Sequence, residues 1–402
     1  MPEANSYRRI LQSSAIIGSS SIFKIFAGLL RLKVAAVLLG PTGIGLIGLY
    51  NNLINMASLV STLGFGTAGT RRIAAARSDS DGAEVEKVLR ALILGVLGLT
   101  VIGAVLFLGA AQFIANDILQ RPDRQQEIAW LALGVAAGVL IAYQIAVFTG
   151  FRHITDLAKV RVISSGLGSV VAVGAIWVYG ERGLVFFVLA VPVATVLVGV
   201  IFLKRIKRSA PVQMSFSEIR KEWHATAALG VTFVISGFVC IAGDLTVRTI
   251  VQRELGLESL GHFQAIWAIS VANLGLILGA MGTDFFPRLS LIMKDPVQAR
   301  RVINEQTEVA LLLCTPLLFI GLGFAPWLLQ ALYSAEFLPA VEILRIQFLA
   351  DILKIVSWPL GVALMAAGAG KTYFCTETTA SGIMVAVVFF ATPVFGLHGV
   401  GL

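Results

Sequence analysis

Long apolar stretches separated by short polar segments make up almost the whole chain. A helix needs about 20 consecutive apolar residues to cross a hydrocarbon core of about 30 Å. The runs are continuous and lack the short alternating pattern of an outer-membrane barrel, so they predict helices. We expect eleven crossings, at residues 10–38, 43–66, 89–114, 127–149, 158–179, 183–204, 225–251, 262–285, 304–328, 339–366 and 372–394.

The composition agrees with an all-α polytopic membrane protein. Hydrophobic residues make up 57% of the chain and the mean hydropathy is +0.87, whereas soluble domains contain roughly 45–50% apolar residues. The first apolar run is too long for a cleavable signal peptide and contains Lys24, so we expect it to remain as the first helix.

Basic residues gather before the first crossing and after each even-numbered crossing. Because cytoplasmic loops are enriched in Lys and Arg, the N-terminus is predicted to be cytoplasmic. The net charge of +8 mostly records this topology, and no soluble basic surface suited to nucleic acid is expected. The predicted cytoplasmic charges are Arg8, Arg9, Arg71, Arg72, Arg77, Lys87, Arg90, Arg152, Lys159, Arg161, Lys204, Arg205, Lys207, Arg208, Arg220, Lys221, Arg288, Lys294, Arg300, Arg301 and Lys371, against Arg121, Arg124, Arg182 and Arg253 outside.

Comparison of the chain with itself indicates an internal repeat. A shift of 216 residues superposes helix ends that share an orientation in the membrane, so the halves are predicted to be parallel repeats. We expect an N-lobe at 1–204, a cytoplasmic linker at 205–222 and a C-lobe at 223–402. The glycine-rich segment 396–402 resembles the entrance to a twelfth helix, which this sequence lacks. The shift places Leu39, Gly40, Gly45, Gly66 and Arg72 on Leu255, Gly256, Gly261, Gly282 and Arg288.

Ionisable residues within the predicted crossings are the candidate functional residues, because charges in such places are expensive and usually functional. Lys24 and Arg31 are seven residues apart and share one helical face. Placing each charge at the bilayer centre costs about 2.5–3.5 kcal/mol. An anionic substrate such as phosphate or pyrophosphate would offset that cost, whereas a proton or drug-cation transporter would favour acidic residues.

Other polar residues within the crossings have either a structural role or a role in a cavity, and the sequence leaves both open. Asp244 and Arg248 are four residues apart, which suits either an ion pair that locks the helix or a site that faces a cavity. Asp351 and Lys354 repeat this arrangement at a three-residue spacing, and Glu377 is a further candidate to share Lys354. Three amides are candidates for a polar cavity, although contacts between helices are their commoner use: Asn51, Asn52 and Gln264.

Several segments resemble a known family. They are Lys24-Ile-Phe-Ala-Gly-Leu-Leu-Arg31, Gly40-Pro-Thr-Gly-Ile-Gly45, Gly150-Phe-Arg152, Phe286-Pro-Arg-Leu-Ser290 and Asp351-Ile-Leu-Lys354. In order and spacing they resemble the Wzx-type flippases, which translocate lipid-linked oligosaccharides such as O-antigen and enterobacterial common antigen precursors. These flippases belong to the superfamily that includes the multidrug and toxic compound extrusion transporters.

The resemblance implies twelve helices in two six-helix lobes around a central cavity, in the bacterial inner membrane. It implies alternating access and an undecaprenyl-pyrophosphate-linked glycan as substrate, with membrane lipids, a glycan polymerase and a chain-length regulator as further partners. No cofactor is implied. By the resemblance, the cavity would be lined or braced by Lys24, Arg31, Asp351, Lys354 and Glu377, and Arg152 and Arg288 would lie at its cytoplasmic mouth. Together with the spacing of Arg248, this makes the candidates for substrate binding Lys24, Arg31, Arg248, Lys354, Arg152 and Arg288. The candidates for energy coupling are Asp244, Asp351 and Glu377.

Two other functions stay open from the sequence. A drug or cation exporter of the same fold is disfavoured by the basic stripe of Lys24 and Arg31. A membrane glycan polymerase or glycosyltransferase would be expected to show paired carboxylates or a large external loop, and the outer loops here are short. The four histidines are widely scattered and predict no metal site. We therefore expect a transporter and not an enzyme.

Overall fold

The computed structural model describes the backbone of residues 2–78, 82–206, 214–293 and 295–400. Side chains are described from Phe23 onward, except within those gaps and at 228, 229, 231–233, 236, 276, 277, 280, 283, 284 and 287. The predicted cytoplasmic charges that lie outside the described side chains are Arg8, Arg9, Lys207, Arg208 and Lys294.

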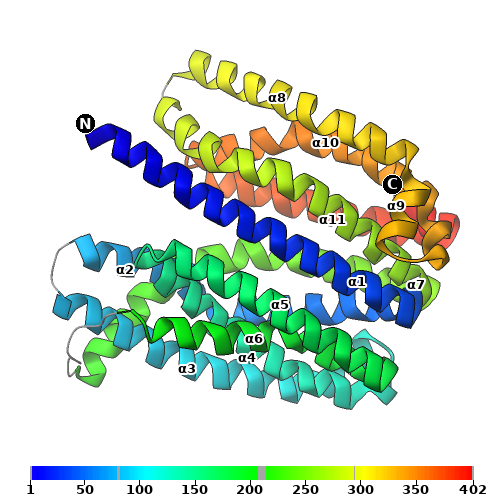
Figure 1. Ribbon diagram of the computed structural model, residues 1–402, viewed down its shortest axis with the longest axis horizontal. Helices are drawn as coiled ribbons and strands as arrows, with labels where there is room; N and C mark the ends of the chain where they lie inside the picture. The colour runs from blue at the N-terminus through cyan, green and yellow to red at the C-terminus, as the bar shows by residue number, and fades with distance from the viewer. Residues whose placement is uncertain (1, 79–81, 207–213, 294, 401–402) are drawn as a thin grey trace. The chain divides into compact units, whose positions relative to one another are not determined.

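The described chain is helical throughout apart from short connections, and it contains no strand between residues 2 and 400 outside those gaps (Figure 1). Helices α1 (Pro2–Thr62) and α7 (Phe216–Ile292) each cover two predicted crossings. The others are α2 (Phe65–Ser78), α3 (Gly82–Phe113), α4 (Gln125–Gly150), α5 (Ile154–Tyr179), α6 (Leu184–Leu203), α8 (Pro296–Gly323), α9 (Ala325–Leu332), α10 (Val341–Ala366) and α11 (Gly370–Phe395), with single turns η1 (Ile114–Ile118), η2 (Pro122–Arg124), η3 (Gly180–Gly183), η4 (Ala335–Ala340) and η5 (Gly396–Val400).

The surface and the helix lengths are those of a multi-pass membrane protein. Seven helical stretches among the described residues are long and apolar enough to cross a bilayer. Val170 on α5 and Phe390 on α11 are each 74% exposed, which is compatible with hydrocarbon around them but would leave a large apolar patch in water. Trp177 and Tyr179 are exposed at the end of α5, as is typical of residues at a membrane interface.

The segment after the second crossing is a helix, α2, and not the basic loop that the sequence predicted. Leu63 and Gly64 form the turn before it with φ of 45° and 73°. Phe65 and Ile73 on α2 are buried in a core shared with α3, α4, α5 and α6. The arginines lower the average hydropathy of this amphipathic segment, so a search for apolar runs misses it.

The start of α7 is fixed by a capping box. The Ser215 N–H donates to Glu218 Oε2 at 2.7 Å, and the Glu218 N–H donates to Ser215 Oγ at 3.3 Å. These reciprocal bonds satisfy donors that a helix N-terminus otherwise leaves free. The hydrogen bond from the Ser215 backbone also lowers the pKa of the Glu218 carboxyl.

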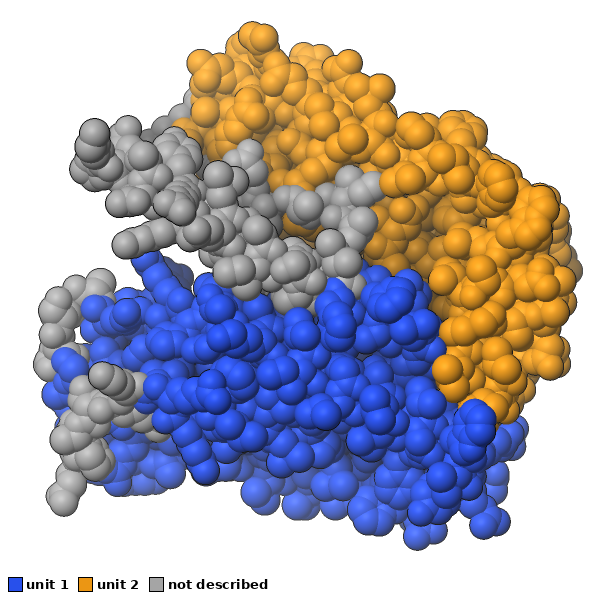
Figure 2. Space-filling view, viewed as in Figure 1, with its two compact units in different colours: residues 1–31, 49–245 blue, residues 32–48, 246–402 orange. Residues whose placement is uncertain are grey.

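Contacts divide the chain into two compact units, coloured separately in Figure 2. Unit 1 comprises residues 1–31 and 49–245, and unit 2 comprises residues 32–48 and 246–402. In unit 1, α3 packs along α4 and α5 along α6, while α4 also contacts α2 and α6. In unit 2, α8 packs along α10, and Phe285, Leu289, Ala299 and Val362 form a small buried cluster. The lobe boundaries expected from the repeat stay a prediction.

The 216-residue shift is visible in the backbone. It carries both ends of α4 onto both ends of α10, and both ends of α5 onto both ends of α11. It also superposes the breaks within α1 and α7, which fall at Gly40 (φ 61°, ψ −166°) and Gly256 (φ 85°, ψ 175°). This region of backbone conformation is essentially restricted to glycine. The repeat that the sequence indicated therefore corresponds to repeated local structure.

Just after these breaks, two helical segments of unit 2 cross at very short range. A Cβ added to Gly45 would lie 2.8 Å from the Leu257 carbonyl oxygen, and a Cβ added to Gly261 would overlap the Pro41 carbonyl oxygen. Gly45 corresponds to Gly261 under the shift, and Pro41 corresponds to Leu257. The same contact is thus made twice, once from each repeat, and we call it the glycine crossing.

Candidate functional site

A cavity of about 250 Å³ lies within unit 1 between α1, α4, α5 and α6. Lys24 of α1 and Arg161 of α5 both line it, and no carboxylate is among its described lining residues. Arg161 is close enough to repel the Lys24 ammonium electrostatically. We call this hollow the cation cavity; its other lining residues are Ile141, Gln144, Ile145, Phe148, Leu157, Val160, Ser164, Ser165, Val191, Pro192 and Thr195.

Polar groups on the helices complete the lining of the cation cavity. Ser164 and Ser165 are buried on α5, one turn after Arg161. Gln144 on α4 donates from Nε2 to the Val196 carbonyl at 2.9 Å, which fixes the orientation of the amide. Its Oε1 is buried and has no hydrogen-bond partner among the described residues. The cavity lining therefore combines two cations with two buried hydroxyls and one fixed amide, and of the hydroxyls Ser164 Oγ already donates to the Arg161 carbonyl at 3.3 Å.

Arg31 lies two helical turns beyond Lys24, as the sequence predicted, but it does not line the cation cavity. Its guanidinium carbon is 5.1 Å from the centre of the Phe187 ring on α6. A cation over an aromatic face is stabilised by about 0.5–2 kcal/mol. The Arg31 Nε is buried without a hydrogen-bond partner in the described part of the chain, so donor capacity is left over.

A larger hollow of about 720 Å³ lies on the other side of Gln144, between α3, α4 and α6. Its lining is mainly aliphatic, and Lys204 is the one charged residue among the described residues that line it. This chemistry is much less selective for an anion than that of the cation cavity. The cation cavity is therefore the better candidate site in unit 1.

In unit 2, two of the predicted cations meet at one indole ring. The Arg248 guanidinium carbon lies 5.7 Å from the ring centre of Trp267, and Lys354 Nζ lies 5.6 Å from the same ring. Arg248 Nε donates to Gln264 Oε1 at 3.1 Å, and Phe263 is a second ring near Arg248, at 5.9 Å. The structure thus brings together Arg248, Lys354 and Gln264, and adds Trp267, which the sequence analysis missed.

Asp351 is fully buried in unit 2 and does not pair directly with Lys354 in the described structure, although their spacing suggested a pair. Its Oδ1 accepts hydrogen bonds from Ser270 Oγ at 2.8 Å and Gln347 Nε2 at 2.9 Å. Neutral donors therefore hold the carboxylate while the lysine faces Trp267. Asp351 Oδ2 is buried without a partner among the described residues.

The remaining predicted residues occupy separate places. Arg152 is exposed in the α4–α5 connection with a φ of 59°. Arg288 near the end of α7 lies 3.9 Å from Glu305 Oε2 of α8. Asn52 is buried, and its Oδ1 has no partner among the described residues, whereas Asn51 is exposed. Asp244 and Glu377 are partly buried, and the expected pairing of Asp244 with Arg248 stays a prediction.

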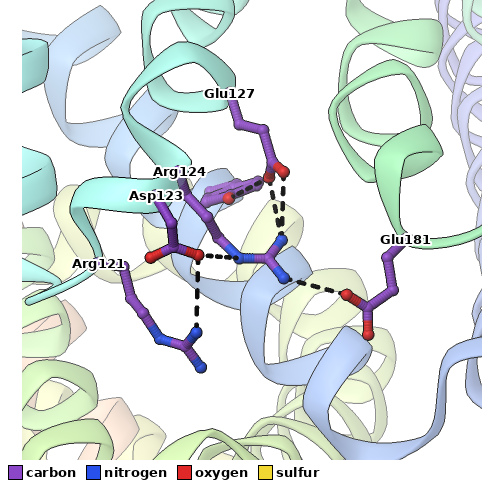
Figure 3. Close-up of polar contacts among 6 residues, drawn as sticks. Arg121, Asp123, Arg124, Glu127 and Glu181 are labelled. Atoms are coloured by element: carbon purple, nitrogen blue, oxygen red, sulfur yellow. Dashed lines mark hydrogen bonds and ion pairs between the residues drawn. The ribbon is translucent and has the colours of Figure 1, made fainter.

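Unit 1 also contains a network of paired charges, drawn in Figure 3. Arg124 of η2 contacts Glu127 at 3.1 Å and Glu181 of η3 at 3.1 Å. The Tyr50 hydroxyl of α1 donates to Glu127 Oε2 at 2.7 Å. This network ties α1, α4 and the α5–α6 connection together. In contrast to the cations of the cavity, its charges are neutralised by neighbours.

The fold is that of a known class of membrane transporter. An inward-facing multidrug resistance transporter of the MATE family in the MOP superfamily superposes with a TM-score of 0.79 at 15% identity, over 96% of this chain and 92% of the other. The lipid II flippase MurJ, in an inward closed conformation, superposes with a TM-score of 0.75 at 15% identity, over 96% and 84%. At this identity the likeness concerns the fold alone, and it defines a MOP-type transporter architecture.

The family is shown by the sequence. Residues 34–342 match the family described as "Polysaccharide biosynthesis protein", and the chain belongs to this family. The lipid III flippase of Escherichia coli (strain K12) is 22% identical over 97% of this chain and 93% of its own length. A putative O-antigen transporter of Shigella flexneri is 22% identical over 90% and 86%. The resemblance drawn from the sequence motifs is confirmed, and both relatives are named as transporters and not as enzymes.

Proposed function

We propose that this chain is a flippase of the bacterial inner membrane for oligosaccharides linked to undecaprenyl pyrophosphate. The observation that carries the proposal is the cation cavity, whose described lining holds two basic residues and no carboxylate. The names of the relatives, a lipid III flippase and a putative O-antigen transporter, support the same substrate class. The glycan would move from the cytoplasmic to the periplasmic leaflet by alternating access.

The chemistry of a pyrophosphate suits the basic residues of unit 1. A guanidinium presents paired donors to two phosphate oxygens, and an ammonium acts as a compact charge. In a weakly hydrated cavity such contacts are stronger than in water. Lys24 would hold the head group and Arg31, with its unused Nε, would meet it further along α1. The polyprenyl chain can stay in the surrounding lipid.

The basic residues at the predicted cytoplasmic side would receive the substrate. Arg152 is exposed, and the weak contact of Arg288 with Glu305, at 3.9 Å, leaves most of its donors available. With the N-terminus in the cytoplasm, both lie on the side where the lipid-linked glycan is assembled.

The predicted orientation can be checked by labelling single cysteines introduced at Lys159 and at Arg182 with a reagent that does not cross the membrane. Only the cysteine at position 182 should react in intact cells.

A cation exporter of the same fold is disfavoured by the same cavity. Lys24 and Arg161 would repel a cationic drug, and the described lining holds no carboxylate to attract one. A glycan polymerase or glycosyltransferase is disfavoured because the two relatives are named as a flippase and a transporter. The chain matches each of them over most of its length. A polymerase and a chain-length regulator stay predicted partners.

The test is transport in proteoliposomes loaded with a lipid-linked glycan. Wild-type protein should flip it, and Lys24→Gln or Arg31→Gln should reduce the rate about 10-fold or more while insertion is unimpaired, since loss of a central charge eases insertion. Arg31→Lys should recover only part of the rate, because a lysine ammonium cannot replace the paired N–H donors of a guanidinium.

Lys33→Gln is the matched control for this test. Lys33 lies on the same helix, but its Nζ donates to the Gln330 carbonyl at 2.7 Å and it does not line the cation cavity. The control should transport at the wild-type rate. Wild-type flipping by both Lys24→Gln and Arg31→Gln would refute the proposal, and uptake of a cationic dye in place of the glycan would establish the exporter.

A further inference from the structure

The geometry points to a diphosphate site inside unit 1 in which Arg161, together with Lys24, holds the head group of the substrate. This inference rests on the proposed function and adds a residue that the topology rule assigned to a cytoplasmic surface. Arg161 lies on α5, which begins at Ile154, so it is two turns into the helix. It lines the cation cavity between α1, α4, α5 and α6.

The position of Arg161 differs from that of an ordinary positive-inside charge. Such charges lie in loops or at helix ends, where water solvates them. Lys159, two residues earlier on the same helix, has this character because it is exposed and does not line the cavity. Arg161, in contrast, is partly buried and lines the cavity. Lys159 is therefore a surface charge, whereas Arg161 belongs to the lining of the cavity.

The described structure provides no counter-charge for Arg161. Among the described residues, Arg161 takes part in none of the ion pairs, and none of the lining residues is acidic. Lys24 is the nearest charged neighbour on the lining, and the two cations repel each other. Like charges brought close together repel each other, and here Arg161 is partly buried while Lys24 is exposed. An anion with more than one negative charge would relieve the repulsion and contact both residues.

The remaining polar groups of the lining suit a diphosphate. The buried hydroxyl of Ser165 can donate to a phosphate oxygen, whereas Ser164 Oγ donates to the Arg161 carbonyl at 3.3 Å. Gln144 is a fixed part of the cavity wall, because its Nε2 donates to the Val196 carbonyl and its Oε1 is buried against α6. Gly199 makes room for this amide, because a Cβ at that position would overlap Gln144 Oε1.

The size of the cavity limits what enters it. Its volume of about 250 Å³ is just below the range of about 300–1,000 Å³ that holds drug-sized ligands. A diphosphate fits this space, whereas an oligosaccharide does not. The glycan and the prenyl chain must therefore lie outside the cavity while the head group occupies it.

The experiment is a binding titration of purified full-length protein in neutral detergent with geranyl pyrophosphate, a short soluble analogue of the polyprenyl head group. Wild-type protein should bind it, with affinity that falls as salt rises. Arg161→Gln should raise Kd about 10-fold or more, because a charge-assisted contact contributes about 1.5–3 kcal/mol. The Kd of Arg161→Lys should lie between those of the wild type and Arg161→Gln. Lys159→Gln should have the wild-type Kd.

Parallel titrations identify the source of the recognised phosphate. Inorganic pyrophosphate should compete with geranyl pyrophosphate, whereas vesicles of phosphatidylglycerol, which carry single phosphates, should not. Competition by the vesicles at equal phosphate concentration would overturn the assignment to a diphosphate. Arg161→Gln protein that melts at the wild-type temperature and binds geranyl pyrophosphate with the wild-type Kd would overturn the site itself.

Transport separates this inference from the proposed function. If wild-type protein flips the lipid-linked glycan and Lys24→Gln does not, while Arg161→Gln is unaffected in both assays, the role of Arg161 is wrong and the proposed function stands. If wild-type protein binds geranyl pyrophosphate through Arg161 but flips no lipid-linked glycan, the proposed function is wrong and the anion site stands.

Discussion

The two sequence repeats fold alike but carry different charges. Helices α4 and α5 of the first repeat correspond end to end with α10 and α11 of the second. Three cations of unit 1, the two that line the cation cavity and Arg31, nevertheless have no basic counterparts 216 residues later. Lys24, Arg31 and Arg161 correspond to Cys240, Val247 and Glu377.

Two charged residues of the second repeat likewise have no charged counterparts in the first. Asp351 and Lys354 of the second repeat correspond to Val135 and Gly138 of the first. Asp351 is held by Ser270 and Gln347, and Lys354 faces Trp267. The charges of unit 2 are therefore contacted by fixed groups of the protein, while Lys24 and Arg161 face an open cavity. The difference teaches that one repeated backbone can leave cations facing a cavity in one half and hold its charges with neighbouring side chains in the other.

Removing the charge of Asp351 should have the largest effect if that residue couples transport to a proton gradient. Asp351→Asn keeps an oxygen acceptor for Ser270 and Gln347 but cannot gain or lose a proton. We expect it to abolish transport driven by a pH gradient and to preserve downhill exchange in vesicles, and we expect the same of Glu377→Gln.

The outward movement of an anion is also driven by an inside-negative potential, by about 2.3 kcal/mol per charge per 100 mV. The pH gradient should therefore be imposed with the potential clamped by valinomycin and potassium. Loss of both activities in Asp351→Asn would assign the residue to a structural brace, and an unchanged gradient dependence in both variants would exclude coupling at these sites.

Removing the indole of Trp267 tests whether unit 2 stabilises its own cations. Trp267→Leu removes the ring from Arg248 and Lys354 together, and each such contact contributes about 0.5–2 kcal/mol. We expect a loss of about 1–4 kcal/mol in the free energy of unfolding, measured in detergent. Phe187→Leu removes the ring from Arg31 alone and should lose about half as much.

Trp267→Phe is the control for this pair of variants, because it keeps an aromatic face and should recover most of the stability. Equal losses in Trp267→Leu and Phe187→Leu would show that the two units do not differ in the way they hold cations.

The charge network of Figure 3 marks the limit of the comparison, because here unit 1 also pairs its charges, and it includes the smallest expected effect, at Glu181. Arg124→Gln should reduce the free energy of unfolding by about 1.5–3 kcal/mol, since the Arg124 side chain is only 13% exposed and bonds to Glu127. Glu181→Gln should cost about 0–1 kcal/mol because Glu181 is 60% exposed. A larger loss for Glu181→Gln than for Arg124→Gln would contradict this order.

Most helices could be predicted from the sequence because each apolar run is long enough to cross a bilayer on its own. The amphipathic α2 could not, since its apolar face is revealed only by the neighbours that bury Phe65 and Ile73. The repeat was visible in five matches because glycines at 40, 45, 256 and 261 are needed for backbone conformation or for close contact.

The candidate site was only partly predictable. Lys24 and Arg31 stood out because a charge within an apolar run is unusual. Arg161 lies near the end of a run, where position alone makes it look like a loop charge, and only the cavity distinguishes it from Lys159. Trp267 and Ser270 were hidden because Lys354 and Asp351, which they contact, lie on α10, at least 81 residues further along the chain. Arg248, the other cation at Trp267, lies on α7 beyond the break at Gly256. Such contacts depend on tertiary packing and leave no local pattern.

The glycine crossing resembles the isologous interface of a symmetric dimer, although both sides of it belong to one polypeptide. Gly45 meets Leu257 and Gly261 meets Pro41, which is the reciprocal pattern that a two-fold axis imposes on identical subunits. A half-length chain with this patch would be self-complementary and could close a symmetric dimer through it. Every charge in such a dimer would occur on both sides of the axis. Covalent linkage of the halves removes that constraint, so that Arg161 and Glu377 can occupy equivalent positions with opposite charge.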